Sequence, residues 1–250
     1  MAQHIAVAGK GGTGKTTFVA LLTRYLLERE KGTVLAVDAD PNANLNEALG
    51  LTVTSYISDI LEETKNPKAI PPGMSKDIFI DYRMSQALVE HDHLDLLVMG
   101  NPQGPGCYCY PSDLLRKQIE GLTGNYDYLV VDNEAGLEHI SRGILPKVQH
   151  LFVISDSSAR GIRSAGRVHQ LVKSLGNKVE NIYLIVTRVG EEGIGALQEE
   201  IEKTELPLIG TIPLDPLVVS YDTEGKPLFE LPDDSVALKA VYGILQKANL

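Results

Sequence analysis

The chain has 250 residues, of which 43% are hydrophobic and 22% are charged, and its formal net charge is −10. A chain of this length forms one large α/β domain or two small ones. The acidic balance argues against nonspecific nucleic-acid binding, which needs clustered Lys and Arg, and against docking on an anionic membrane. A solvated surface that keeps the protein soluble explains the acidity most simply.

The N-terminal sequence "MAQHIAVAGKGG" has no basic leader before an apolar stretch, so we expect no secretory signal. No apolar run approaches the roughly 18 to 20 residues that span a bilayer. We therefore expect a cytoplasmic protein. Its compartment would be reducing, with thiols that are free or metal-bound rather than bridged.

Apolar, β-branched runs alternate with helical patterns along the chain. The runs lack strict polar alternation, which is typical of strands covered by helices on both faces. The pattern predicts a doubly wound, mostly parallel α/β sheet in one domain, residues 1–250, while residues 41–93 are less regular and 66–77 form a Pro-rich loop or flap. Strands are expected at 4–9, 33–38, 94–100, 128–133, 150–155 and 181–187, and helices at 16–30, 111–120, 160–175, 193–203 and 235–249.

The stretch "GKGGTGKTT", residues 9–17, matches the phosphate-binding loop G-x-x-x-x-G-K-[ST] between an expected strand and an expected helix. Its glycines let backbone N–H groups turn toward phosphate oxygens, and the helix N-terminus favours an anion. Lys15 is expected to reach the β and γ phosphates, and Thr16 to coordinate Mg²⁺. The alternative is a glycine turn without a ligand. The nucleotide-binding residues expected here are Gly11, Gly12, Thr13, Gly14, Lys15, Thr16 and Thr17.

A second lysine, Lys10, follows the first glycine of this loop. With it the sequence resembles the deviant-Walker P-loop ATPases, the group of MinD, ParA and the nitrogenase iron protein, whose loop reads G-K-G-G-x-G-K-T-T. In that family the extra lysine reaches the ATP of a partner subunit. The resemblance therefore implies an ATP-dependent homodimer, in which a cation from the other chain stabilises charge on the transferred phosphoryl group. A solvated loop charge is the alternative for Lys10.

Two acidic segments follow expected strands. In "VDADPNANL", residues 37–45, the resemblance implies a first switch in which Asp38 joins the Mg²⁺ water shell and Asp40 orients the attacking water. An acidic turn that caps the next helix is the alternative. "VVDNEAG", residues 130–136, has the shape of a Walker B strand and second switch. Asp132 is expected to hold a Mg²⁺-bound water, and the Gly136 amide to sense the γ-phosphate. Lys10, Lys15 and Asp40 are thus the expected catalytic residues.

The base contact is expected from Thr187, Arg188 and Pro213. Much of the family has V-x-N-[KR] where this chain has "IVTR", so Thr187 stands in place of an adenine-reading Asn. Arg188 and the "IPLD" loop, residues 212–215, remain to hold the base. The guanine-reading N-K-x-D is absent from the sequence, which favours ATP.

Both cysteines of the chain lie in "GCYCY", at Cys107 and Cys109. Two thiolates at i and i+2 of an extended segment point to one side and can share a metal ion. Zinc in structural sites is coordinated by four ligands, and nickel with soft donors commonly takes four as well. Two cysteines from each subunit of a two-fold dimer would therefore complete a Ni²⁺ or Zn²⁺ site. Two buried thiols are the alternative, whereas a disulfide would close a very tight ring.

"GCYC" together with "DNEAGLEHISRG", residues 132–143, resembles the CooC-type ATPases, nickel-insertion accessory proteins of carbon monoxide dehydrogenase with a sister group for acetyl-CoA synthase. The resemblance implies an ATPase that binds Ni²⁺ or Zn²⁺ through the paired cysteines and delivers nickel to such a client enzyme. Rival interpretations are a MinD/ParA-like positioning or partitioning ATPase and a redox-switched ATPase. His91, His93 and His139 are possible further ligands, although surface or structural roles explain them as well.

Overall fold

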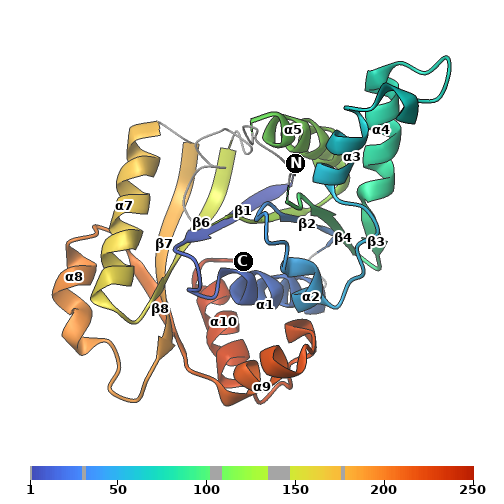
Figure 1. The fold of residues 1–250 in the computed structure, drawn as a ribbon. Helices are drawn as coiled ribbons and strands as arrows, with labels where there is room; N and C mark the ends of the chain where they lie inside the picture. The colour runs from blue at the N-terminus through green and yellow to red at the C-terminus, as the bar shows by residue number, and fades with distance from the viewer. Residues whose placement is uncertain (1, 30–31, 102–108, 135–146, 176–177) are drawn as a thin grey trace.

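An eight-stranded sheet forms the centre of the computed structural model, which describes residues 2–29, 32–101, 109–134, 147–175 and 178–250 (Figure 1). The strand order is β3-β4-β2-β5-β1-β6-β7-β8, and every neighbouring pair is parallel except β3 and β4. The expected doubly wound, mostly parallel α/β fold is confirmed. The strands are β1 (Gln3–Gly9), β2 (Val34–Asp38), β3 (Val89–His91), β4 (Leu94–Val98), β5 (Tyr128–Asp132), β6 (Lys147–Asp156), β7 (Lys178–Val189) and β8 (Leu208–Pro213).

Both faces of the sheet are covered by helices, which explains why the central strands β1, β2 and β5 are largely apolar and buried. In β1, Ile5 and Val7 face one apolar cluster, while Ala6 and Ala8 face the other. The first cluster lies beneath α1 (Lys15–Glu28), α2 (Leu45–Leu49), α9 (Pro216–Glu224) and α10 (Val236–Lys247). The second lies beneath α3 (Ile57–Glu63), α4 (Lys76–Ala87), α5 (Cys109–Leu122), α7 (Ala159–Leu175) and α8 (Gln198–Glu202) (Figure 1).

The C-terminal helix α10, expected at 235–249, packs its apolar side on the sheet. Its buried residues recur at helical spacing and include Leu238, Val241 and Leu245, and its N-terminus is capped by the Ser235 side chain, which accepts a hydrogen bond from the Leu238 amide. No helix within the described ranges is long and apolar enough to cross a bilayer.

Residues 41–93 are more regular than the sequence indicated. They contain α2, α3, the 3₁₀ turn η1 (Pro67–Ala69), α4 and β3. The Pro-rich loop expected at 66–77 is therefore shorter, because Asn66 caps η1 and Ser75 caps α4. The helix expected at 193–203 is instead η3 (Gly195–Leu197) followed by the five-residue α8; two further 3₁₀ turns are η2 (Thr123–Asn125) and η4 (Leu228–Glu230).

Candidate nucleotide site

The loop between β1 and α1 lies at the carboxyl edge of the parallel strands, where open α/β sheets bind ligands. Gly9 must be glycine, because a Cβ there would lie 2.3 Å from the carbonyl oxygen of Ile154 on β6. Gly14, at φ 89°, takes the left-handed conformation that starts α1. The Thr13 hydroxyl donates to the Lys10 carbonyl at 2.8 Å and closes the loop on itself. The expected phosphate-binding loop thus has the strand–loop–helix context that it requires.

Thr187, expected to contact the base, also holds the loop. Its hydroxyl lies 2.7 Å from the Thr13 carbonyl oxygen and 3.2 Å from that of Ser155, and its single proton is shared between these backbone acceptors. The side chain is buried at the end of β7. The sequence alone could not predict this hydrogen bond, because no motif specifies which strand end lies next to the phosphate-binding loop.

Asp132, at the end of β5, meets the start of α1. The Thr16 hydroxyl donates to Asp132 Oδ2 at 2.6 Å, and Oδ1 is buried without a hydrogen-bond partner among the described residues. Burial raises the pKa of Asp132 to about 6, although the Thr16 hydrogen bond and the charge of Lys15 act in the opposite direction. A hydroxyl and a carboxylate with an unused oxygen fit the oxygen ligands that Mg²⁺ prefers.

Asp38 lies beside Asp132 on the neighbouring strand β2. Its two carboxylate oxygens accept hydrogen bonds from the Asp40 amide at 3.0 Å and the Leu45 amide at 2.9 Å. Burial, followed by the charge of Asp132, raises the pKa of Asp38 to about 7. In this conformation Asp38 therefore organises the turn into α2, which is the capping role that the sequence left open.

A pocket of about 320 Å³ opens above the phosphate-binding loop. Lys15, almost fully buried, lines it from below, and Asp40 lines it from the turn after β2. Asp40 Oδ1 accepts hydrogen bonds from both the amide and the side-chain nitrogen of Asn42, each at 2.9 Å. The lining is Gly11, Gly12, Gly14, Lys15, Thr16, Thr17, Asp40, Asn42, Asn44, Glu134 and Arg188.

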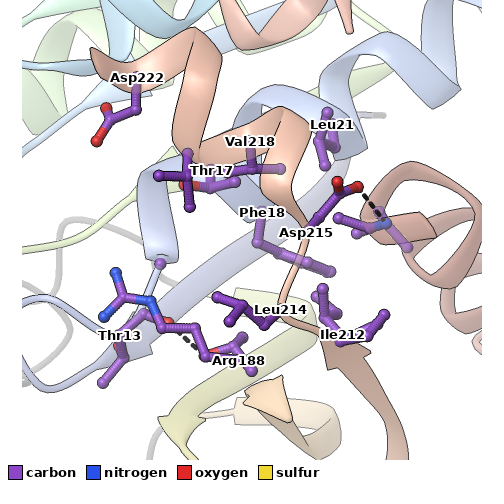
Figure 2. Close-up of a pocket in the computed structure, with 16 residues that line it drawn as sticks. Thr13, Thr17, Phe18, Leu21, Arg188, Ile212, Leu214, Asp215, Val218 and Asp222 are labelled. Atoms are coloured by element: carbon purple, nitrogen blue, oxygen red, sulfur yellow. Dashed lines mark hydrogen bonds between the residues drawn. The ribbon is translucent and has the colours of Figure 1, made fainter. Parts of the chain in front are cut away.

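A second, mainly apolar pocket of about 140 Å³ adjoins the first and lies between α1, the end of β7 and the β8–α9 connection (Figure 2). The two pockets share Gly14, Thr17 and Arg188, so phosphates and base could occupy them together. Arg188 has a left-handed backbone at φ 55°. The sequence anticipated Thr187, Arg188 and Pro213 but missed the apolar lining from Phe18, Leu21, Ile212, Leu214 and Val218.

Asp215 lines this second pocket, yet its carboxylate is already bound within the protein. Oδ1 accepts from the Leu217 amide at 2.8 Å, and Oδ2 accepts from the Ser235 hydroxyl at 2.6 Å and the Ala237 amide at 3.0 Å. Burial raises the pKa of Asp215, but the hydrogen bonds from Ala237 and Ser235 more than offset this and leave it below its usual range. Asp215 therefore fixes the pocket wall.

Some expected site residues lie outside the described residues. These are Cys107 and Gly136, together with His139. Cys109 is the first residue of α5. Within the described ranges, no group of three or more His, Cys, Asp or Glu side chains is arranged to hold a metal ion. His91 and His93 are exposed at the β3–β4 turn, at the amino end of β4 and thus at the edge opposite the nucleotide pockets.

Comparison with known proteins agrees with this geometry. The family model of the CobQ/CobB/MinD/ParA nucleotide-binding domain matches residues 4–228. The chain belongs to this family. Among its relatives, an ATP-binding protein of Methanocaldococcus jannaschii described as uncharacterized is 40% identical over 246 residues, with 97% of each chain covered.

Two further similarities come from proteins with a described role. The carbon monoxide dehydrogenase accessory protein CooC of Rhodospirillum rubrum is 30% identical, with 92% of this chain and 90% of CooC covered. The cell division ATPase MinD of Pyrococcus furiosus has a solved structure that superposes with a TM-score of 0.73 at 24% identity, over 100% of this chain and 99% of MinD. The MinD structure shows the fold, and the family establishes a P-loop nucleotide-binding protein.

Proposed function

We propose that this protein is a Mg²⁺-dependent ATPase that forms a homodimer with ATP, binds nickel or zinc through Cys107 and Cys109 of both chains, and delivers nickel during maturation of carbon monoxide dehydrogenase or acetyl-CoA synthase. The similarity to CooC over most of both chains supports this role. So does the C-x-C pair of the sequence, whose second cysteine, Cys109, is the first residue of α5.

The observation that carries the proposal is a lateral chain of backbone hydrogen bonds at the carboxyl edge of the sheet. The Ala39 amide donates to the Asp132 carbonyl at 3.0 Å, and the Met99 amide donates to the Asp38 carbonyl at 2.8 Å. The Ser58 amide then donates to the Met99 carbonyl at 2.9 Å. Residues 102–108, with Cys107, follow Met99 closely. A movement of the two switches, residues 37–45 and 130–136, would therefore shift Met99, and with it the start of the segment that contains Cys107.

The residues that line the pocket above the phosphate-binding loop have the chemistry for phosphoryl transfer to water. Lys15 would neutralise the β and γ phosphates, and Thr16 with Asp132 would hold Mg²⁺, which supplies charge neutralisation there when bound. Asp40 would orient the attacking water. Lys10 is exposed at the loop, as a lysine that reaches the nucleotide of a second subunit must be. Electrostatic stabilisation of the transition state would thus come from both chains.

The metal cargo accounts for the coupling of ATP binding to dimerisation. Each chain has two thiols, so a four-sulfur site needs two chains. ATP would bring the two chains together and complete the site, and hydrolysis would separate them and release the nickel to the client enzyme. Thiolates are soft ligands that suit both nickel and zinc.

The test is the nickel stoichiometry per chain, measured anaerobically with reductant, in the absence of nucleotide and with ADP or a non-hydrolysable ATP analogue. Molar mass is followed by light scattering in the same samples. We expect one nickel per two chains, bound by a dimer. The double variant Cys107→Ala/Cys109→Ala should lose the metal and keep nucleotide binding, because its phosphate-binding loop is intact.

Nickel bound equally by this double variant would contradict the thiol site. Absence of nickel in every nucleotide state would leave a switch ATPase of the MinD/ParA type without metal delivery.

A further inference from the structure

The exposed side of α7 carries a line of arginines. Arg160, Arg163 and Arg167 are all exposed, and the line continues to Leu171, whose side chain is 40% exposed although it is apolar. Steps of three, four and four residues keep these side chains on one face of a helix, over about 16 Å at 1.5 Å per residue. We call this set of four residues the arginine stripe.

Helix stability does not explain where the stripe begins. Arg160 stands in the first turn of α7, which has no acidic residue. A cation there opposes the helix dipole, which favours negative charge at the N-terminus. Other helices of the chain follow that preference, with Asp77 in the first turn of α4 and Glu199 in that of α8.

Two guanidinium groups of the stripe are available to a partner. Arg163 forms an ion pair with Glu200 of α8 at 3.3 Å. Arg160 and Arg167 have no ion-pair partner among the described residues, in a chain with a net charge of −10. A guanidinium group binds a carboxylate through two parallel hydrogen bonds, which a lysine cannot do.

We propose that the arginine stripe docks an acidic helix of a partner protein. Carboxylates at helical spacing match Arg160 and Arg167, and an apolar residue of the same helix would cover Leu171. Nucleic acid fits less well, because its phosphates continue past the stripe and meet Glu199 and other acidic residues of α8, which packs against α7. A helix, by contrast, can carry its carboxylates only at the positions opposite the arginines.

The stripe begins at the nucleotide edge of the sheet. α7 starts shortly after the carboxyl end of β6 (Figure 1). The Ser157 hydroxyl donates to the carbonyl of Arg188 at 3.1 Å, and Arg188 lines both nucleotide pockets. A helix docked on the stripe therefore lies beside the rim of the nucleotide site. This inference does not depend on the proposed metal cargo.

The test uses the full chain and a fluorescent helical peptide in which three Glu, spaced by three and four residues, are followed by Leu. Binding is measured by fluorescence anisotropy at low salt. We expect Arg160→Glu/Arg167→Glu to weaken binding at least about tenfold, because attraction becomes repulsion. The matched control Lys239→Glu/Lys247→Glu makes the same charge change on α10, across the sheet, and should bind as wild type does. Arg160→Glu should hold or raise the thermal midpoint, because it places an acid in the first turn.

Four results would overturn the proposal. They are no binding of the Glu peptide to wild type, equal binding of a peptide with Gln in place of Glu, equal binding by the stripe variant, and tighter arginine-dependent binding of a 20-base-pair DNA duplex. If the double Glu variant fails to fold, Arg160→Gln/Arg167→Gln replaces it, with a smaller loss expected.

Discussion

At the scale of single residues, two buried carboxylates define the nucleotide edge. Asp38 and Asp132 are paired across β2 and β5, and both are almost fully buried. Their pKa values are raised to about 7 and about 6, first of all by burial. The folded chain without ligand therefore takes up protons that the unfolded chain has released between about pH 4 and pH 7.

The sign of the pH dependence follows from these pKa values. A raised carboxyl pKa in the folded state means that the free energy of unfolding falls as pH rises through this window. Asp132→Asn removes one such carboxylate and can keep the hydrogen bond from Thr16. We expect the variant to be more stable than wild type at pH 8, by on the order of 1 to 3 kcal/mol, and equal to it near pH 4. Urea unfolding without nucleotide or Mg²⁺, from pH 4 to pH 8, measures this.

The difference between the two proteins is the quantity to compare, because histidines titrate in the same range. Burial lowers the pKa of His4 and His150, so their contribution to stability rises with pH and opposes that of Asp132. Both proteins share these histidines. A constant difference from pH 4 to pH 8 would contradict a raised pKa for Asp132. Mg²⁺ with nucleotide should remove the advantage of the variant, because the wild-type carboxylate then gains a cation.

The sequence predicted the phosphate-binding loop residue by residue because a loop motif is local. Gly9, Gly14 and Lys15 stand where the motif places them. The roles of Thr187 and Asp215 could not be predicted, since each depends on a hydrogen bond across strands or helices distant in the chain. Motifs record ligand contacts, whereas the side chains that hold those contacts in place are set by tertiary packing.

At the scale of elements, long apolar runs were predictable, whereas short or glycine-containing elements and the mixed polar and apolar helix α4 were not. The buried strands β1, β2, β4, β5, β6 and β7 were all expected. The edge strand β8 was missed because Gly210 and Pro213 weaken its strand pattern, and β3 has only three residues. Helices α2 and α3 have five and seven residues, too few for a helical period to be clear.

One buried hydroxyl joins three elements beside the nucleotide site. Ser235 caps α10 through the Leu238 amide at 3.1 Å and donates to Asp215 Oδ2 at 2.6 Å, in the β8–α9 connection. Ser235→Ala removes the cap and one donor to a buried carboxylate. We expect a loss of about 1 to 3 kcal/mol in the free energy of unfolding, measured in urea. Nucleotide affinity should fall too, because Asp215 lines the second, mainly apolar pocket, where we expect the base to bind.

The matched control for this cap is Ser220→Ala. Ser220 is exposed on α9, where its hydroxyl donates to Glu224 at 2.7 Å, so the same change should cost little there. Equal losses for the two variants would show that Ser235 carries no special role.

At the scale of the whole molecule, several of the features described above lie at the carboxyl edge of the sheet. This edge holds the phosphate-binding loop, and its backbone hydrogen bonds run from Asp132 through Asp38 to Met99. The arginine stripe begins at the same edge. The opposite edge carries His91 and His93, outside the nucleotide site. Nucleotide, metal cargo and partner would thus act on one surface, which a second subunit could cover.

Replacement of Lys10 tests whether this edge of the sheet binds a second chain when ATP is present. Lys10 is exposed, in contrast to the buried Lys15 of the same loop. In the proposed dimer Lys10 would reach the partner's nucleotide, and Lys15 would bind the nucleotide of its own chain. We expect Lys10→Ala to abolish the mass increase that ATP causes in light scattering, and to change nucleotide affinity of the monomer less than threefold or so. Lys147→Ala is the matched control, because this exposed lysine starts β6 at the opposite edge and pairs with Glu180. Dimers that persist in Lys10→Ala with ATP would show that other contacts join the chains and that dimerisation does not depend on Lys10.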